Sequence, residues 1–190
     1  YDFSAKVTQS FSLYAKWTER TTEPSGWRNP FADVKNTDWF YSDVQYAHEN
    51  NLFAGISDTE FGPNNPMTRA MLVTVLYRAE GGRSLEDEIL GYPFADVDAE
   101  NWYSDAVYWA RLHGIVKGYS DEEFVPDQEI SREQIAAIME RYADFKGIAT
   151  DEKGDLSQFV DVSQISDWAK GNVQWAVGAS LISGRDDGTV

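Results

Sequence analysis

The sequence repeats one pattern three times along its 190 residues. Three similar segments open with Phe31-Ala32-Asp33-Val34, Phe94-Ala95-Asp96-Val97 and Phe159-Val160-Asp161-Val162, and their starts are 63 and 65 residues apart. In a chain of this kind each unit buries its apolar face against its neighbours, and surface grows with every added unit. The repetition therefore favours a binding or scaffolding role.

The composition is that of a folded, acidic chain. Hydrophobic residues make up 42% of the sequence, including 7 Trp, 10 Tyr and 10 Phe, which is enough to fill a core. The formal net charge of −16 argues against nucleic acid as a partner, because phosphate binding needs clustered cations. An anion can still bind at a local site built from a few of the 16 Lys and Arg. Cysteine is absent, which excludes disulfides, thiol catalysis and Cys-based zinc sites.

The chain divides into an N-terminal segment, a linker and three repeats. Residues 1–17 alternate apolar and polar side chains, which predicts a short N-terminal β-hairpin at the end of an upstream β repeat. Residues 18–30 are polar, contain Pro and Gly, and predict a linker. The predicted repeats span residues 31–81, 94–147 and 159–190.

Both ends of the sequence suggest a longer parent chain. Tyr1 falls inside the first predicted strand, so the lack of a signal peptide says nothing about the compartment. The third repeat reaches Val190 at the position of Phe61 and Phe124, so we expect its second helix to be truncated or replaced by another segment. No apolar run approaches the ~20 residues of a membrane span.

Each repeat predicts a helix, a loop and a second helix, which makes the fold class mainly α. A tryptophan precedes the first helix in every repeat, at Trp39, Trp102 and Trp168. The first helices then share a Val and an Ala three residues apart on one face: Val44/Ala47, Val107/Ala110 and Val173/Ala176. The loops share a glycine at Gly55, Gly118 and Gly184.

The second helices begin at Thr68 and Ser131. Ser131 and Gln134 have the spacing of a capping box, in which hydroxyl and amide each satisfy a free backbone N–H. Thr68 has Met71 at the reciprocal position, so we expect that half of the box to be missing. Apolar residues then recur at spacings of 3, 4 and 7, namely Leu72, Val75, Leu76 and Ala79 against Ile135, Ile138, Met139 and Tyr142.

These motifs resemble those of the S-layer homology (SLH) family, over residues 31–190. That family's repeats read F-x-D-V, Trp, a short helix, Gly-x-x-x-Gly, F-x-P and T-R-A-E. The second repeat matches with Phe94-Ala-Asp-Val, Trp102, Gly114-x-x-x-Gly118, Phe124-x-Pro126 and Ser131-Arg132-Glu133-Gln134. The first matches with Phe31-Ala-Asp-Val, Trp39, Gly55, Phe61-x-Pro63 and Thr68-Arg69-Ala70-Met71, with Asn51 in place of the earlier glycine. Leu13-Tyr14-Ala15-Lys16-Trp17 is similar to the end of a Listeria–Bacteroides type surface repeat.

The resemblance implies a non-enzymatic anchor in the cell wall of a Gram-positive type bacterium, outside the cell. It implies helix–loop–helix repeats arranged as a pseudo-trimer around a central helical bundle. Grooves between the repeats are then expected to bind secondary cell-wall polysaccharide, commonly through a pyruvate ketal on a sugar. The arginine of the T-R-A-E motif would contact that carboxylate, and glycines and aromatic residues would line the groove.

The chemistry of two arginines fits such a ligand. Arg69 and Arg132 each follow a predicted helix N-cap, Thr68 or Ser131, where free backbone N–H groups also favour an anion. A planar guanidinium can hold a carboxylate through two parallel hydrogen bonds. The alternative is a surface arginine paired with a nearby acid, but repetition at equivalent places favours binding.

Other candidate ligand-binding residues carry a structural alternative. Trp39, Trp102 and Trp168 could stack on sugar rings, although packing in the core or between repeats is the expected role for most of them. Gly55 and Gly118 could supply positive φ or let a ligand approach the backbone, or could cap a helix. Tyr119 follows Gly118 in the predicted binding loop.

No catalytic or metal site is predicted, and no cofactor. The repeated loop acids Asp58, Asp121 and Asp187 lack the spacing of an EF-hand and are better explained as Asx turns. His48 and His113 are not at equivalent positions, so a shared metal or catalytic role is not expected. Paired acids alone do not make a glycosidase, which needs a defined separation and a perturbed pKa.

Two other functions stay open at this point. The repeats could mediate assembly with other surface-protein subunits, since an incomplete third repeat leaves apolar surface exposed. Alternatively, the chain could be the non-catalytic anchor of an extracellular glycoside hydrolase.

Overall fold

The structure is a computed structural model that describes residues 26–82, 85 and 94–190. Within these residues it contains five α-helices, one short 3-10 helix and no strand apart from an isolated bridge between Thr68 and Glu129. The helices are α1 (Tyr41–Glu49), α2 (Arg69–Ala79), α3 (Ser104–Leu112), α4 (Arg132–Phe145), η1 (Val162–Gln164) and α5 (Lys170–Gly178). The mainly α prediction is confirmed. The β-hairpin predicted for residues 1–17 lies outside the described residues.

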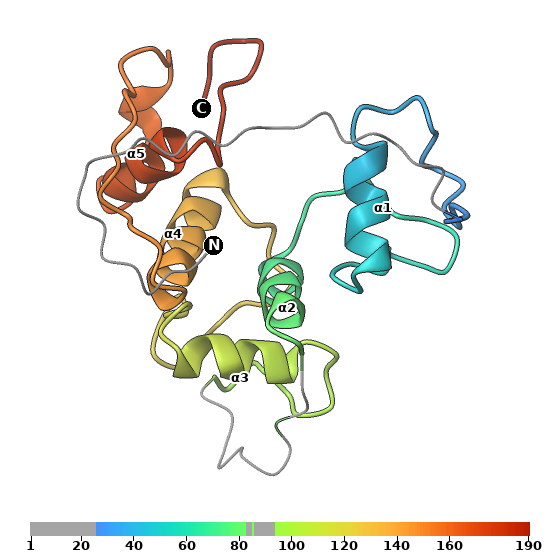
Figure 1. Ribbon diagram of the computed structural model, residues 1–190. Coiled ribbons are helices and arrows are strands. Elements are labelled where there is room, and N and C mark those ends of the chain that lie inside the picture. The colour runs from blue at the N-terminus through green and yellow to red at the C-terminus, as the bar shows by residue number, and fades with distance from the viewer. Residues whose placement is uncertain (1–25, 83–84, 86–93) are drawn as a thin grey trace, which may run out of the picture.

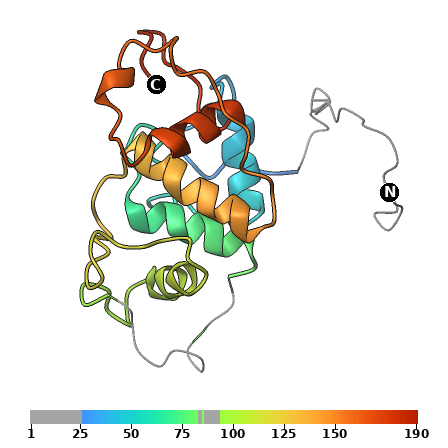
Figure 2. The same ribbon diagram turned by 90° about the vertical axis from the view of Figure 1, so that its left-hand side faces the viewer.

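The helices pair across the repeats. The second helix of one repeat packs against the first helix of the next, so α2 lies against α3 and α4 lies against α5 (Figure 1). Helix α1 belongs to neither pair and stands on the far side of α2 from α5. Figure 2 shows α4 between α2 and α5, so the two pairs lie next to each other. Each helix pair therefore contains residues from two repeats.

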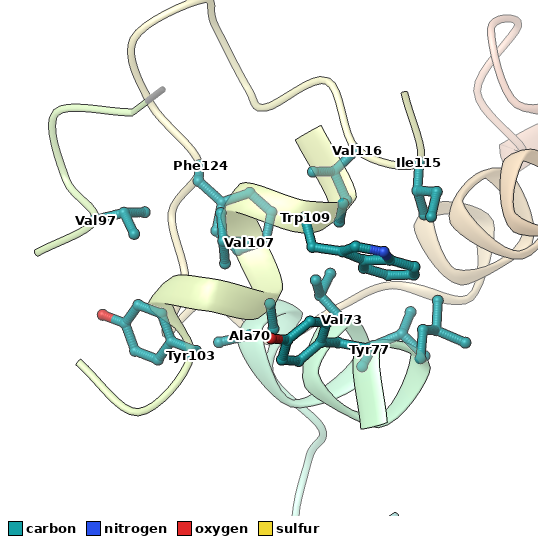
Figure 3. Packing of buried hydrophobic residues seen from close by; sticks show 14 of the residues in the cluster. Ala70, Val73, Tyr77, Val97, Tyr103, Val107, Trp109, Ile115, Val116 and Phe124 are labelled. Atoms are coloured by element: carbon teal, nitrogen blue, oxygen red, sulfur yellow. The ribbon is translucent and has the colours of Figure 1, made fainter. Parts of the chain in front are cut away.

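The larger core lies between α2 and α3. Ala70, Val73 and Tyr77 of α2 belong to the same buried cluster as Val107 and Trp109 of α3 (Figure 3). Full burial of a valine side chain such as that of Val73 or Val107 stabilises the fold by roughly 1.5–3 kcal/mol. The sequence predicted another stripe on α2, of which Leu72 and Leu76 are buried but Ala79 is exposed. Helix α2 buries a second face because it has neighbours on more than one side.

A second core lies between α4 and α5, and polar contacts join them. Ala136 and Ala143 of α4 cluster with Trp175 of α5. The Glu133 carboxylate accepts hydrogen bonds from the Ser166 backbone N–H and hydroxyl, both at 3.0 Å. The third repeat is thereby attached to the second helix of the second repeat.

The aspartate of each opening motif accepts hydrogen bonds from the end of the loop in its own repeat. Asp33 accepts from the backbone N–H groups of Phe61 and Gly62, at 2.9 and 2.8 Å. Hydrogen bonds of the same kind join Asp96 to Phe124 and Val125, and Asp161 to Val190. The bond from Phe61 is the main reason why the pKa of Asp33 is lowered. Each repeat is therefore closed by a contact between its first residues and the end of its loop.

The caps of the second helices differ from the prediction at one position. Ser131 and Gln134 form the expected capping box, with Ser131 Oγ accepting from the Gln134 N–H at 3.3 Å. At Thr68 the reciprocal contact is present too, because the Met71 thioether accepts from the Thr68 N–H at 3.5 Å. The expectation that the reciprocal half of this capping box is missing was wrong, although a thioether sulfur is a weak hydrogen-bond acceptor.

Gly118 has a structural requirement for glycine. Its φ is +79°, and a Cβ there would lie 2.5 Å from the ring of Phe94 and 2.4 Å from the Ser120 carbonyl oxygen. Gly55 repeats this arrangement against Phe31, with φ of +90°. These glycines let the loop close over the opening phenylalanine, which is a different role from the helix cap considered above.

Candidate functional site

One groove gathers residues from all three repeats. Its volume is about 520 Å³, and we call it the repeat-2 groove. It is lined by Arg69, Val116, Lys117, Gly118, Tyr119, Glu133, Gln134, Ala137, Ile138, Arg141 and Trp168. Arg69 comes from the first repeat, Trp168 from the third, and the remaining residues from the loop and helix α4 of the second. Helix pairing across repeats is what brings these segments together.

The repeat-2 groove is positively charged in a negatively charged protein. Three of its lining residues are cationic, Arg69, Lys117 and Arg141, while Glu133 is its one acidic residue. The Glu133 carboxylate is already engaged by Ser166. Local excess of cations attracts an anion even when the whole molecule carries a net negative charge.

Arg69 is held rigidly at the edge of this groove. Its side chain is only 5% exposed, and its Nε donates to the Phe124 carbonyl at 2.9 Å. The guanidinium lies 4.7 Å from the ring centroids of both Tyr119 and Phe124. Burial lowers the pKa of Arg69, but the group stays charged at neutral pH. Arg69 therefore combines a structural role with its place in the groove.

Arg132 occupies the corresponding place against the third repeat. One of its terminal nitrogens donates to the Ser183 carbonyl at 2.5 Å, and its Nε is buried with no hydrogen-bond partner among the described residues. It lines a pocket of about 350 Å³ together with Ser131 and Arg185. Burial and the charge of Arg185 both lower the pKa of Arg132. Within the described residues no carboxylate lies within 4.0 Å of Arg69 or Arg132, so the acid-paired alternative is not what the structure shows.

A less polar groove occupies the equivalent place in the first repeat. This repeat-1 groove has a volume of about 340 Å³. It is lined by Phe53, Ala54, Gly55, Ile56, Met71, Thr74, Val75, Arg78 and Trp102. Ala54, Ile56 and Met71 stand where the repeat-2 groove has Lys117, Tyr119 and Gln134. The two grooves therefore share a backbone arrangement but differ in polarity.

The candidate site residues do not converge on one place. Arg69, Gly118 and Tyr119 meet in the repeat-2 groove, and Gly55 and Trp102 line the repeat-1 groove. Ser131 and Arg132 line the pocket beside the third repeat. Trp39 lines a separate apolar pocket beside α1, and Thr68 caps α2.

The repeated tryptophans are not buried in the core. Trp39, Trp102 and Trp168 are 88%, 60% and 57% exposed, and Trp102 and Trp168 line grooves to which a neighbouring repeat contributes. Exposed indoles beside grooves are available for stacking on an apolar ligand face.

Three polar groove residues were missed by the sequence interpretation, since Lys117, Gln134 and Arg141 were not proposed for binding. Trp168 was proposed for stacking on a sugar ring, but not for this groove. A signal existed for Arg141, because Arg78 lies at the equivalent position. A terminal nitrogen of each of these two arginines points to an equivalent loop carbonyl, of Leu52 at 3.4 Å and of Ile115 at 3.5 Å.

Neither a metal-binding cluster nor a membrane-spanning helix occurs in the part of the chain that the structure describes. Across residues 26–82, 85 and 94–190, His, Cys, Asp and Glu form no group of three or more that could hold a metal ion. None of the helices in that part of the chain is long and apolar enough to cross a membrane.

Comparison with known proteins identifies the repeats. The family model described as S-layer homology domain matches residues 30–70, 93–136 and 158–190, with a shorter third match. The chain is 32% identical over 183 residues to an endoglucanase of Bacillus sp. (strain KSM-635), covering 96% of this chain and 19% of that protein. It is 32% identical over 144 residues to the surface-layer 125 kDa protein of Lysinibacillus sphaericus, covering 75% and 11%.

A cellulosome-anchoring protein of Acetivibrio thermocellus is 28% identical over 141 residues, covering 73% of this chain and 30% of that protein. The chain thus spans less than a third of the length of each of these relatives. Because the family model covers more than half of the sequence in three ordered segments, the chain belongs to the S-layer homology family and carries three of its repeats.

Proposed function

We propose that these repeats anchor a bacterial surface protein to the cell wall from outside the cell. The similarity to a surface-layer protein and to a cellulosome-anchoring protein supports this role. The ligand is secondary cell-wall polysaccharide of a Gram-positive type wall, and the segment itself has no catalytic activity. The observation that carries the proposal is the cationic repeat-2 groove in a chain with a net charge of −16.

The repeat-2 groove binds the carboxylate of a pyruvylated sugar. Lys117 and Arg141 supply positive charge, and the guanidinium of Arg69 faces the groove beside the Tyr119 ring. Gln134, whose Nε2 donates to the Tyr119 hydroxyl at 2.7 Å, orients that ring and can exchange this bond for a sugar hydroxyl. The exposed indole of Trp168 stacks on the apolar face of a sugar ring.

The repeats form a pseudo-trimer around a shared helical centre. Support comes from the two helix pairs, α2 with α3 and α4 with α5, which repeat one relation between successive units. In such an arrangement Arg132 and Arg185 line a second anion site, equivalent to the place of Arg69 and Tyr119.

Charge removal in the groove tests the proposal. Lys117 is exposed and makes no described hydrogen bond, so Lys117→Ala leaves the fold intact. We expect it to weaken binding to purified wall polysaccharide about three- to tenfold, with a smaller salt dependence. Lys35→Ala removes one exposed charge outside the groove and is the matched control. Equal affinities of both variants and the parent would refute the proposed groove.

A second candidate function follows from the similarity to the endoglucanase. The repeats would then anchor an extracellular glycoside hydrolase carried on the same polypeptide. The groove chemistry is the same in this case, and the difference lies in what is anchored. Hydrolysis of polysaccharide by residues 1–190 alone would overturn the proposal that this segment is non-catalytic.

A further inference from the structure

The residues that lead into the first repeat fold back onto its first helix. The indole Nε1–H of Trp27 donates a hydrogen bond to Nδ1 of His48 on α1, at 3.2 Å. The Trp27 ring also packs edge-on against that of Tyr41, with 5.5 Å between the ring centroids. We call residues 26–30 the entry segment, and we infer that Trp27 and His48 form a pH-dependent clasp for it. The clasp holds the entry segment on α1 while His48 is neutral and releases it when His48 is protonated.

The direction of this hydrogen bond requires a neutral imidazole. An indole N–H can only donate, so Nδ1 of His48 accepts and carries no proton. A protonated imidazole has hydrogen on both nitrogens and cannot accept. Histidine is the side chain that ordinarily changes charge between pH 5 and 8, and His48 is half-buried, so solvent protons can reach it. Protonation of His48 therefore breaks the bond and sets two donors against each other.

The second repeat shows that a cation at this position is compatible with a folded repeat. Arg111 stands at the position of His48, 63 residues later. Its guanidinium lies 5.5 Å from the centroid of the Phe94 ring. The His48 ring lies 5.3 Å from that of Phe31, the counterpart of Phe94. A protonated His48 can thus keep its contact with the opening phenylalanine, and the contact with Trp27 is the one that is lost.

The Asn29 side chain attaches the same segment to the opening motif. Its Nδ2 donates to the Val34 carbonyl at 2.7 Å, and its Oδ1 accepts from the Phe31 backbone N–H at 2.9 Å. An amide side chain does not titrate, so these bonds persist when His48 gains a proton. Release of Trp27 therefore ends at Asn29, and it changes the direction in which the polypeptide enters the repeat.

An acid is available to pair with the protonated form of His48. The charged side chains of the surrounding elements are all exposed: Arg28 in the entry segment, Asp33 in the opening motif, Asp43 and Glu49 on α1, and Asp58 and Glu60 in the loop after α1. In the second repeat the Asp121 carboxylate lies 3.8 Å from Arg111, and Asp58 stands at the position of Asp121. Among the described residues no carboxylate lies within 4.0 Å of His48 in the clasped state.

The test follows the indole proton of Trp27 by NMR in residues 1–190, with its signal identified by its loss in Trp27→Phe. We expect this proton to exchange at least about tenfold faster at about pH 5 than at about pH 8, once the intrinsic pH dependence of exchange is removed. His48→Asn keeps a neutral acceptor near the position of Nδ1 and should retain protection at both pH values. His48→Arg copies Arg111 and should lose protection at both. Protection that does not change with pH in the parent, or that persists in His48→Arg, would overturn the inference.

Two controls separate release of the clasp from other effects of acid. His113→Asn removes the other histidine of the chain and should leave the pH dependence of Trp27 exchange unchanged, whereas its disappearance in this variant would refute the clasp. The backbone amide of Val44, which is buried on α1, should stay protected at both pH values. Loss of protection at Val44 together with Trp27 would mean that acid unfolds the repeat, which contradicts a clasp. Glycan binding plays no part in these readouts, so their outcome is independent of the proposed function.

Discussion

The repeat-1 and repeat-2 grooves have the same backbone and different chemistry. In both, a glycine with positive φ packs against the opening phenylalanine and an arginine of the second helix points to a loop carbonyl. In the repeat-2 groove the loop adds Lys117 and Tyr119, and the preceding repeat adds Arg69. The repeat-1 groove has Ala54 and Ile56 at those loop positions. The repeat thus supplies a scaffold, and a few side chains decide which scaffold can bind an anion.

The largest effect is expected where the two grooves are alike. Gly118→Ala should destabilise the fold by about 3 kcal/mol, because φ is +79° and the new Cβ would clash with the Ser120 carbonyl. Gly55→Ala should cost a similar amount, as measured by urea unfolding. Gly114→Ala is the matched control, since its φ is +70° but no atom lies within 4 Å of the Cβ position. It should cost about 1 kcal/mol. Equal effects at Gly114 and Gly118 would contradict the packing explanation.

Arg69→Ala is expected to have the next largest effect, because it removes an arginine that has no equivalent in the repeat-1 groove. We expect more than about tenfold weaker binding of wall polysaccharide. We also expect a stability loss of about 2 kcal/mol, because the buried Phe124 carbonyl loses its donor. Calorimetric titration and urea unfolding measure the two effects. Arg28→Ala removes a cation outside both grooves and should change neither. Loss of affinity without loss of stability would contradict the rigid placement of Arg69.

Conversion of one groove into the other should have an intermediate effect. The double variant Lys117→Ala with Tyr119→Ile gives the repeat-2 groove the loop residues of the repeat-1 groove. We expect about tenfold weaker binding with little change in stability, because both side chains are exposed. The reverse variant, Ala54→Lys with Ile56→Tyr, should add no binding site to those of the parent chain, since no arginine equivalent to Arg69 is present in the described groove. A titration of the reverse variant that shows one site more than the parent would mean that the loop alone suffices.

The smallest expected effect concerns the contact between α2 and α4. The Tyr142 hydroxyl and the Lys146 ammonium donate to the Glu80 carboxylate, at 2.6 and 2.9 Å. These bonds lower the pKa of Glu80, with the bond from Tyr142 as the largest cause. A depressed carboxyl pKa contributes stability above its unfolded value of about 4.3, and this contribution is lost as pH falls through the folded pKa.

Glu80→Gln should therefore slightly lower the free energy of unfolding near neutral pH, and its difference from the parent should shrink as the pH falls below about 4.3. Burial and the bond to Glu80 raise the pKa of Tyr142 to about 12. Its contribution is present below the unfolded value of about 10 and is lost between about pH 10 and 12. Tyr142→Phe should remove that alkaline loss. If the free energy of unfolding had the same pH dependence in the parent and in both variants, the contact of Glu80 with Tyr142 and Lys146 would not contribute to stability.

The sequence predicted much of the fold because its signals are local. Periodicity located the helices, and Ser131 with Gln134 predicted a cap that the structure contains. Contacts across repeats were not predictable in the same way. The burial of Arg69 depends on Phe124 and Tyr119, which are 55 and 50 residues further along the chain. The position of Arg69 next to a helix cap did not indicate that its side chain is buried.

The candidate site was predicted only in part for the same reason. Gly118, Tyr119 and Arg69 were each proposed as ligand-binding residues, and the structure shows that they line the same groove. Trp168 was not assigned to the groove, because it arrives from the third repeat through the pairing of α4 with α5. Comparison of Arg78 with Arg141 at equivalent positions could have found the latter from the sequence.

The most direct test of the account is a calorimetric titration of this chain with purified Gram-positive wall polysaccharide, native and with its pyruvate ketal removed. The account predicts binding of the native polymer and at least about tenfold weaker binding after removal of the carboxylate. Equal affinity for both polymers, or binding to neither, would contradict a carboxylate-binding repeat-2 groove.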